Sequence, residues 1–299
     1  MTTTATARPI LAPDPTPAPA ARRRRLRTAR IVHRALLALV LLIQVYPFVW
    51  LVLTSVRSPE DFAAGSPFAP PSSFTPDNFV RAFAQGDIPA YILNSAIVTA
   101  GACALIVICG MTGAYAIQVL GFAGAGIVRG VFLMGIVVPV QIALVPLFID
   151  YSRIGLLDTH LAIIIPLAGF ALPMSLFLFT SFFGYIPREI YEAACLDGAG
   201  PYRIFTRITL PMSLNTVITV VMVNAIFIWN EFVFANTFVL TEGLKTIPLG
   251  LQNYIGNMGK TDWTATFAAV AVTVTPLLLV FLALNKAMIY GLESGSTKG

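Results

Sequence analysis

Long apolar stretches without a charged side chain are the feature that most limits what this chain can fold into. Arg34 and Arg57 enclose 22 uncharged residues, and Asp262 and Lys286 enclose 23. About 20 apolar residues are enough for an α-helix to cross a hydrocarbon core of ~30 Å. The apolar runs are continuous rather than alternating, which favours helices over a β-barrel. The sequence therefore predicts an all-α, polytopic membrane protein.

Six stretches of this kind predict six transmembrane helices, at about 35–56, 95–119, 130–149, 161–183, 213–240 and 264–288. The second helix is alternatively shorter, with part of residues 88–95 lying at the membrane interface. Several of the helices contain proline, which frees a backbone carbonyl and bends a helix. Bends of this kind are typical of proteins that move solutes, although proline is also common in membrane helices in general.

The composition excludes several classes of function. Hydrophobic residues make up 57% of the 299 residues and charged residues 11%, against about 25% charged in a soluble domain. A soluble chain of this size could not bury so much apolar surface, which rules out a soluble enzyme. The net charge is +5, but the basic residues lie at the ends of apolar runs, so we expect no nucleic-acid partner. Three cysteines and two histidines predict no structural disulfide and no metal site.

The placement of lysine and arginine predicts the orientation, because cytoplasmic loops carry an excess of both. With the N-terminus inside, 14 of the 19 lysines and arginines lie inside, so both termini are predicted to be cytoplasmic. Residues 1–34 are predicted to be a disordered basic tail and residues 286–299 a second cytoplasmic tail. The run Arg22–Arg25 fits an anchor for the first helix. A signal peptide is the disfavoured alternative, because the apolar run that follows is too long.

The one long cytoplasmic connection, residues 186–211, has the pattern of a compact helix–turn–helix. Pro187 suits the start of a first helix, and Pro201 suits the start of a second that runs to about Thr209. Gly198, together with Gly200, can supply the left-handed cap between them. A small apolar face is formed by Ile190, Ala193 and Ala194. Such small residues would let another protein approach closely.

This connection carries a long and specific motif. It reads Glu192-Ala193-Ala194, three residues, Gly198, nine residues, Ile208, one residue, Leu210-Pro211. Every defined position matches the signature loop of ABC-transporter permease subunits, and about residues 40–299 resemble that family. The permease domain is expected at 91–285, and residues 186–211 are called the signature loop from here on.

The chain is similar in particular to the smaller permease subunit of maltose-type, carbohydrate-uptake importers. The residues that carry this resemblance are Asn94-Ser95, Gly155–Thr159, Pro187–Ile190, Trp229–Phe232 and Gly291–Gly299. Glu293 departs from the pattern, because an uncharged residue is more usual there.

The resemblance implies the type I ABC importer permease fold, in the plasma or inner membrane of the cell. It implies a non-enzymatic subunit that forms half of the transmembrane path for a sugar or sugar-like solute. A permease for glycerol phosphate or a polyamine is the alternative. The implied partners are a second permease subunit, an ATP-binding cassette ATPase dimer and an extracytoplasmic solute-binding protein. No cofactor is expected on this chain, which has no G-x-x-x-x-G-K-[ST] stretch, so the partner is expected to hydrolyse the ATP.

In that family the signature loop is the coupling helix, which sits in a cleft of the ATPase. The residues that the resemblance assigns to this contact are Glu192, Ala193, Ala194, Asp197, Gly198, Ile208, Leu210 and Pro211. Glu192 would make the polar contact, the alanines would permit close approach, and Gly198 would allow the turn. The C-terminal Lys298 and Gly299 are implied to reach the same ATPase interface.

Polar residues within the predicted helices are the candidates for the solute path. They are Gln141, Asn224, Trp229, Asn230, Glu231 and, as a further polar candidate, Asn236. Glu231 is the one ionisable residue predicted deep inside a helix, where such groups mark a pathway or an interface. Trp229 and Asn230 can stack on and hydrogen-bond a sugar. Alternatively, Glu231 pairs with the partner permease or lies near the outer water, and the amides bond neighbouring helices.

Two other functions compete with an ABC permease. A secondary carrier coupled to protons or sodium would use Glu231 as its titrating group, but it leaves the signature loop unexplained and lacks an evident inverted repeat. An intramembrane enzyme lacks a plausible catalytic set, because no paired aspartates lie within the predicted helices.

Overall fold

The computed structural model describes residues 19–66, 69–255 and 261–296. These ranges are mostly helical, and an isolated antiparallel bridge pairs Arg57 with Phe74. Four helices are long and apolar enough to cross a membrane, and two bent pairs of helices raise the number of candidate spans to six. The predicted all-α, polytopic architecture is therefore confirmed, with four to six candidate spans.

The chain divides into two units, residues 1–51 and 52–299. In its described part the first unit is helix α1, Pro19–Ser55, which continues to the start of the second unit. The prediction of a disordered tail up to residue 34 is wrong for residues 19–34, which are helical. Alanine, leucine and arginine are strong helix formers, and adding turns to an existing helix needs no new nucleus. The rest of the predicted tail, residues 1–18, lies outside the described residues.

Three further helices cross as single spans. Helix α4, Ile88–Ala114, continues without a break into the π-helix η1, Tyr115–Leu120. It begins seven residues before the predicted 95, because Asp87 caps the N–H of Ala90 and Pro89 fits its first turn. Helix α7, His160–Phe183, agrees with its prediction.

Helix α14, Trp263–Ser296, is longer than the predicted 264–288. It extends through residues 286–296, which were predicted to form a separate cytoplasmic tail. Lys286 is followed by Ala-Met-Ile-Tyr, in which nothing breaks a helix. Lys298 and Gly299, the predicted ATPase contacts of the tail, lie outside the described residues.

The predicted third helix, 130–149, is not continuous. Helices α5, Ala125–Gly135, and α6, Val140–Ile154, are bent by 95° at a short break. Pro139 lies in this break with an extended backbone. Proline has no N–H to donate and disfavours a helical conformation in the residue before it, so the helix ends there.

The predicted fifth helix, 213–240, is also divided. Helix α11, Leu214–Trp229, ends at Asn230, and the short helix α12, Val233–Phe238, follows. The side chain of Asn230 donates to the carbonyl of Ile226 at 2.8 Å, which satisfies one carbonyl of the last turn. The run of apolar residues continues from α11 into α12, so the hydropathy pattern did not predict this break.

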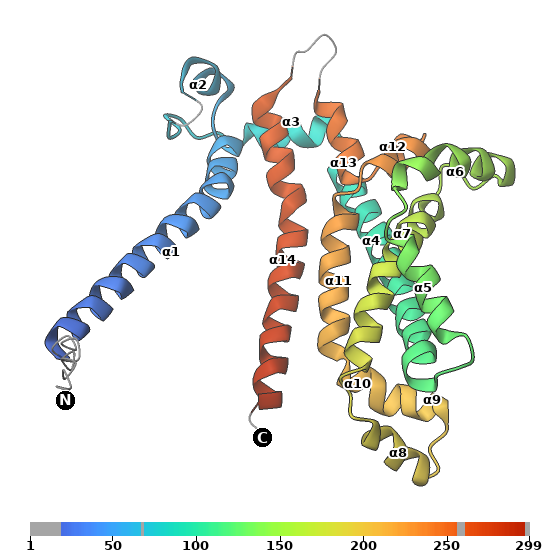
Figure 1. Ribbon diagram of the computed structural model, residues 1–299. Helices are drawn as coiled ribbons and strands as arrows, with labels where there is room; N and C mark the ends of the chain where they lie inside the picture. The colour runs from blue at the N-terminus through green and yellow to red at the C-terminus, as the bar shows by residue number, and fades with distance from the viewer. Residues whose placement is uncertain (1–18, 67–68, 256–260, 297–299) are drawn as a thin grey trace, which may run out of the picture. The chain divides into compact units, whose positions relative to one another are not determined.

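Helices α4, α7 and α11 pack against one another and form the main core of the second unit. Figure 1 shows the three side by side, with the signature loop at one end and α12 and α13, Ile247–Gly250, at the other. Small residues let the helices approach: a Cβ on Gly110 of α4 would lie 3.2 Å from the buried ring of Phe179 of α7. Close packing of this kind replaces the hydrophobic driving force that is absent within lipid.

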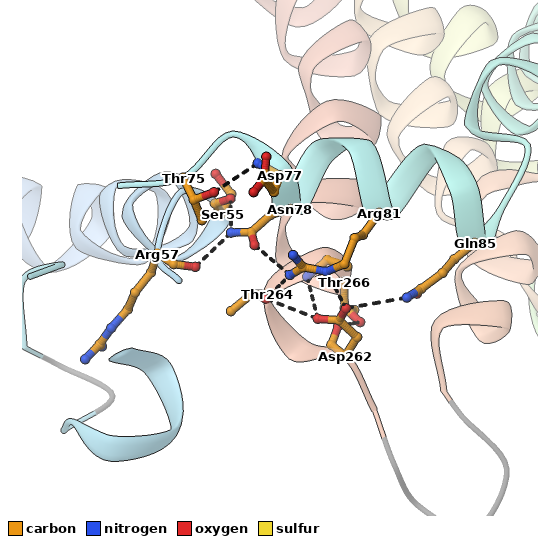
Figure 2. Close-up of polar contacts among 11 residues, drawn as sticks. Ser55, Arg57, Thr75, Asp77, Asn78, Arg81, Gln85, Asp262, Thr264 and Thr266 are labelled. Atoms are coloured by element: carbon orange, nitrogen blue, oxygen red, sulfur yellow. Dashed lines mark hydrogen bonds and ion pairs between the residues drawn. The ribbon is translucent and has the colours of Figure 1, made fainter. Parts of the chain in front are cut away.

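A polar network joins the short helix α3, Asp77–Gln85, to its neighbours at the end opposite the signature loop (Figure 2). The amide of Asn78, which is fully buried, donates to the carbonyls of Ser55 and Arg57, both at 2.8 Å. Arg81 forms an ion pair with Asp262 at 2.8 Å and a hydrogen bond to Asn78. Within the second unit, the network fixes residues 55–57 and the start of α14 on α3.

The segment that precedes α3 folds around a buried arginine. Arg57 is 2% exposed, and its guanidinium bonds the carboxylate of Asp61 at 2.9 Å and the carbonyl of Ser66 at 3.0 Å. Asp61 lies in helix α2, Pro59–Ala64. The hydrogen bonds from Arg57 and Ser72 lower the pKa of the Asp61 carboxyl to about 2. An ionised pair therefore closes this loop.

Candidate functional site

The first half of the signature loop is helix α8, Arg188–Leu196, which ends in a left-handed glycine. Gly198 has φ of 76°. Its N–H donates to the carbonyl of Cys195 at 3.0 Å, and the N–H of Ala199 donates to the carbonyl of Ala194 at 2.9 Å. These two bonds form the Schellman motif, in which glycine carries the positive φ. The predicted turn at Gly198 is confirmed by this geometry.

The second half of the loop begins at Pro201, as predicted. It comprises α9, Pro201–Ile204, the π-helix η2, Phe205–Thr209, and α10, Leu210–Met212. The chain then bends by 69° into α11. The signature loop is thus a pair of short helices joined by a tight turn, and it leads directly into a helix of the core.

Most of the residues predicted to contact the ATPase are accessible in the isolated chain. Those that are exposed are Glu192, Ala193, Asp197, Gly198, Leu210 and Pro211. Ile208 is half-buried and packs against the core. Ala194 is buried at 9% exposure within this chain, so of the two motif alanines Ala193 is the one on the accessible face of α8. Neighbouring residues of an α-helix point about 100° apart, so the core covers Ala194 and leaves Ala193 exposed.

Large apolar side chains that sequence reasoning missed lie exposed on and beside the signature loop. Leu196 is 89% exposed, Tyr202 81% and Tyr185 84%. Leu196 and Tyr202 flank the turn at Gly198, so they lie on either side of the tip of the loop. In the sequence, the available signal was the position of Leu196 and Tyr202 on either side of the predicted turn. The signature motif does not include these two residues. Apolar residues exposed together in this way mark a contact surface.

A pocket of about 380 Å³ lies beside the first helix of the loop. It is lined on one side by the end of η1 and on the other by the start of α8, the residues being Gln118–Gly121, Phe183, Gly184, Ile186, Arg188, Tyr191 and Glu192. Glu192 therefore lies at the border between the exposed face of α8 and this pocket. The charged groups Arg188 and Glu192 make it polar.

Two of the predicted path residues bind other parts of the chain. Asn224 of α11 donates to the hydroxyl of Ser175 of α7 at 3.2 Å and to the carbonyl of Val220. Trp229 is buried and packs in a small cluster with Tyr91 and Ile247. Both contacts match the alternative that polar and aromatic residues here join neighbouring helices. Gln141, Asn230 and Asn236 are exposed.

Glu231 is not deep inside a continuous helix, which corrects its predicted position. It follows the end of α11, and its carboxylate accepts the N–H of Phe234 at 2.7 Å and of Ala235 at 3.2 Å. These are N–H groups of the first turn of α12, which have no partner within that helix. A carboxylate at this position also favours the helix dipole. The side chain therefore caps α12.

Two of the sequence stretches that carried the resemblance, Asn94-Ser95 and Gly155–Thr159, contact one loop at the end opposite the signature loop. Asp158 accepts the N–H of Leu240 at 2.8 Å and of Thr241 at 2.8 Å. Asn94 donates to the carbonyls of Gly243 at 2.8 Å and Lys245 at 3.0 Å.

His160 and Ser95 complete these contacts. His160 Nε2 lies 2.9 Å from the side-chain oxygen of Asn94, and the Ser95 hydroxyl accepts the N–H of Ile247 at 2.9 Å. The segment 238–247, called the far loop below, is thus held by side chains from α4 and from the turn before α7. No sequence signal indicated that these separated stretches would contact the same loop.

Comparison with known proteins agrees with this geometry. The family described as "Binding-protein-dependent transport system inner membrane component" matches residues 106–289. The probable ABC transporter permease protein YurM of Bacillus subtilis is 37% identical over 263 residues, which are 88% of this chain and 87% of YurM. The diacetylchitobiose uptake system permease protein NgcG of Streptomyces coelicolor is 33% identical over 271 residues, 90% of this chain and 89% of NgcG. The trehalose/maltose transport system permease protein MalG of Thermococcus litoralis is 30% identical over 272 residues, 90% of this chain and 96% of MalG.

Solved structures share the fold. A chain of a bacterial ABC transporter involved in the import of the acidic polysaccharide alginate matches with a TM-score of 0.76 and 20% identity, over 91% of this chain and 99% of that chain. A chain of the MetNI methionine ABC transporter matches with a TM-score of 0.53 and 18% identity, over 67% of this chain and 94% of that chain.

A broken-helix bundle that carries a two-helix signature loop defines a permease of the ABC importer class. The chain belongs to the family of binding-protein-dependent transport system inner membrane components. It is therefore a multi-pass membrane protein and a transporter component rather than an enzyme. The predicted type I permease fold is confirmed.

Proposed function

We propose that this chain forms half of the transmembrane path of an ATP-driven importer for a sugar or sugar-like solute. A second permease subunit would supply the other half, two ATPase subunits would supply energy, and an extracytoplasmic binding protein would deliver the solute. The relatives named for diacetylchitobiose and for trehalose and maltose support a sugar. Their similarity extends over most of this chain, which includes the helices of the core.

The accessible tip of the signature loop is the observation that carries this proposal. Glu192 and Ala193 are exposed on α8, and Leu196 and Tyr202 project at the turn. Exposed leucine and tyrosine beside a carboxylate fit a docking contact, because buried apolar anchors supply most of the energy of an interface. We place this end of the bundle in the cytoplasm, where ATP is available, in agreement with the distribution of lysine and arginine.

The path itself is proposed to lie where this chain meets the second permease. Gln141 and Asn230 are exposed polar residues and remain candidates for its wall. Asn224, Trp229 and Glu231 are not assigned to the wall. Their contacts join α11 to α7, to α4 and α13, and to α12, respectively. The bonds of Glu231 to α12 give this carboxylate a structural role that requires no proton coupling.

Two glutamates one turn apart on α8 allow a matched test. Glu189 and Glu192 are both exposed, and only Glu192 belongs to the signature motif. The whole complex is purified from membranes, and the amount of ATPase that co-purifies is measured for each alanine variant. Uptake of radiolabelled maltose, trehalose and diacetylchitobiose is measured in cells that carry the same variants.

We expect Glu192→Ala to lower ATPase recovery and uptake by about tenfold, the effect of losing one charged interface contact, whereas Glu189→Ala stays near the parent. Uptake that continues without ATP and stops with an ionophore would overturn the proposal in favour of a secondary carrier. If uptake fails for all three sugars while the ATPase co-purifies, the proposed solute class is wrong. The proposed contact with the ATPase then still stands.

A further inference from the structure

Two π-helical turns meet at the signature-loop end of the bundle. One is η1 at the end of α4, and the other is η2 in the second half of the loop. The rings of Tyr115 and Phe205 lie 5.1 Å apart between centroids, and the Tyr115 hydroxyl donates to the carbonyl of Pro201 at 2.8 Å. Tyr115 is 6% exposed. One side chain thus joins α4 to the loop by both a ring contact and a hydrogen bond.

The same helix reaches the far loop at its other end. Residues 88–120 form one span of 33 residues, about 50 Å long at 1.5 Å per residue. Asn94 and Ser95 hold the far loop through its carbonyls and the N–H of Ile247. Because α4 is unbroken over this distance, a shift at Tyr115 displaces the groups that hold the far loop.

The first helix of the loop, α8, lies beside η1, with a pocket between parts of the two. The pocket of about 380 Å³ lies between the end of η1, at Gln118 and Gly121, and the start of α8, at Arg188 and Glu192. The Thr209 hydroxyl of η2 also lies 3.4 Å from the Tyr191 hydroxyl of α8. Movement of α8 therefore reaches η2, where Tyr115 makes its contacts, through this side-chain contact and through the turn at Gly198.

The π-helical form of both contact segments fits a place where helices shift. Such turns are rare and occur frequently at functional sites, because an extra residue widens the turn and weakens the regular hydrogen-bond ladder. Here the two π-helices, η1 and η2, contact each other directly through the rings of Tyr115 and Phe205.

We propose that Tyr115 is the positioning residue that transmits movement of the signature loop into α4 and so to the far loop. This inference rests on the proposed function, because the ATPase supplies the movement. It goes beyond docking, since Tyr115 is buried within this chain and would not touch the ATPase. Removal of its contacts should uncouple the two ends and leave docking in place.

The test follows the far loop while the ATPase is cycled. Cys103, Cys109 and Cys195 are replaced by serine, and Leu240→Cys places a single thiol on the far loop, where Leu240 is 73% exposed. The whole complex is labelled in membrane vesicles with an impermeant maleimide, with and without trapping by ATP and vanadate. The measured quantity is the ratio of the two labelling rates.

In the parent we expect trapping to change the labelling rate by about fivefold or more, within the range of coupling between two sites. Tyr115→Ala should bring this ratio close to one while the ATPase still co-purifies. Tyr115→Phe keeps the ring and loses one hydrogen bond, so an intermediate ratio, of about two- to threefold, is expected. Tyr254→Phe removes the hydroxyl of another buried tyrosine, which donates to the carbonyl of Ala82 outside the far loop, and should match the parent.

A parental ratio in both Tyr115 variants, with the ATPase bound, would overturn the inference and leave the proposed function standing. A parent that shows no response to ATP and retains no ATPase would overturn the proposed function itself. If Tyr115→Ala fails to assemble, Tyr115→Phe alone decides, because loss of one hydroxyl leaves the ring packing intact.

Discussion

Asp158 and Thr241 are joined twice, because one carboxylate accepts both the backbone N–H and the side-chain hydroxyl of Thr241. Asp158 itself has φ of 59°, a conformation that non-glycine residues rarely adopt and that aspartate tolerates better than most. Its own N–H donates to the carbonyl of Phe238 at 2.8 Å. This reciprocal set of bonds fixes the far loop on the turn before α7.

Replacement of this carboxylate should release the far loop. In Asp158→Ala the N–H groups of Leu240 and Thr241 lose their acceptor, which costs about 1–2 kcal/mol. Amide exchange at residues 240–241, measured by mass spectrometry on the purified complex, should become about tenfold faster. Asp150→Ala is the control, because that exposed aspartate makes only a 4.0 Å contact with Arg153. Unchanged exchange in Asp158→Ala would show that the loop is held by other contacts.

The same contact should resist mild acid. Hydrogen bonds from Thr241 and from the N–H of Leu240 hold the pKa of the Asp158 carboxyl below its usual value of 3.8. A carboxyl with a lowered folded pKa stabilises the fold above its unfolded pKa and loses that contribution as the pH falls through the folded value. Exchange at residues 240–241, corrected for the intrinsic rate, should therefore be equal at pH 7 and pH 5. Faster corrected exchange at pH 5 would contradict this assignment.

The turn of the signature loop should depend on one glycine and not on its neighbour. Neither Gly198 nor Gly200 has an atom within 4 Å of an added Cβ, but only Gly198 has a positive φ, of 76°. Gly198→Ala places a side chain in the left-handed region, at a cost of about 1–2 kcal/mol, whereas Gly200→Ala is free of this strain. Uptake and ATPase co-purification should fall several-fold in the first variant and stay near the parent in the second. Equal uptake and equal ATPase recovery in the two variants would show that the left-handed turn at Gly198 is not needed for coupling.

Glu231 should matter to the stability of the complex more than to transport. Glu231→Ala removes the acceptor for the N–H groups of Phe234 and Ala235 and should cost about 1 kcal/mol, as loss of a helix cap does. Glu231→Gln retains a side-chain oxygen, so uptake should change by less than about threefold. Thermal unfolding of the purified complex and sugar uptake check the two effects separately. Loss of uptake in Glu231→Gln with the complex assembled would restore a role in the solute path.

Hydropathy and the signature motif predicted most of the fold and the accessible loop. The apolar runs located α7 within a residue of its start, because Thr159 caps the N–H of Ala162 where the run begins. Pro187, Gly198 and Pro201 set the ends of α8 and α9 through local backbone preferences. These features depend on residues close together in the sequence, so the sequence alone carries them.

The breaks and the long-range contacts were not predictable in this way. The chain stays apolar across Asn230 and Glu231, and only the capping bonds of the structure reveal that α11 ends there. Ala193 and Ala194 look alike in the motif, yet the core covers one and leaves the other exposed. Contacts between stretches that are distant in sequence decide such differences.

Photo-crosslinking from the tip of the signature loop tests the central claim most directly. A benzophenone amino acid replaces the exposed Ala193, and the complex is irradiated in native membranes. The account predicts a crosslink to the ATPase subunit, and no such product from the same group at Leu240 on the far loop. A crosslink to the ATPase from Leu240, or none from Ala193 while the ATPase co-purifies with the chain, would contradict it.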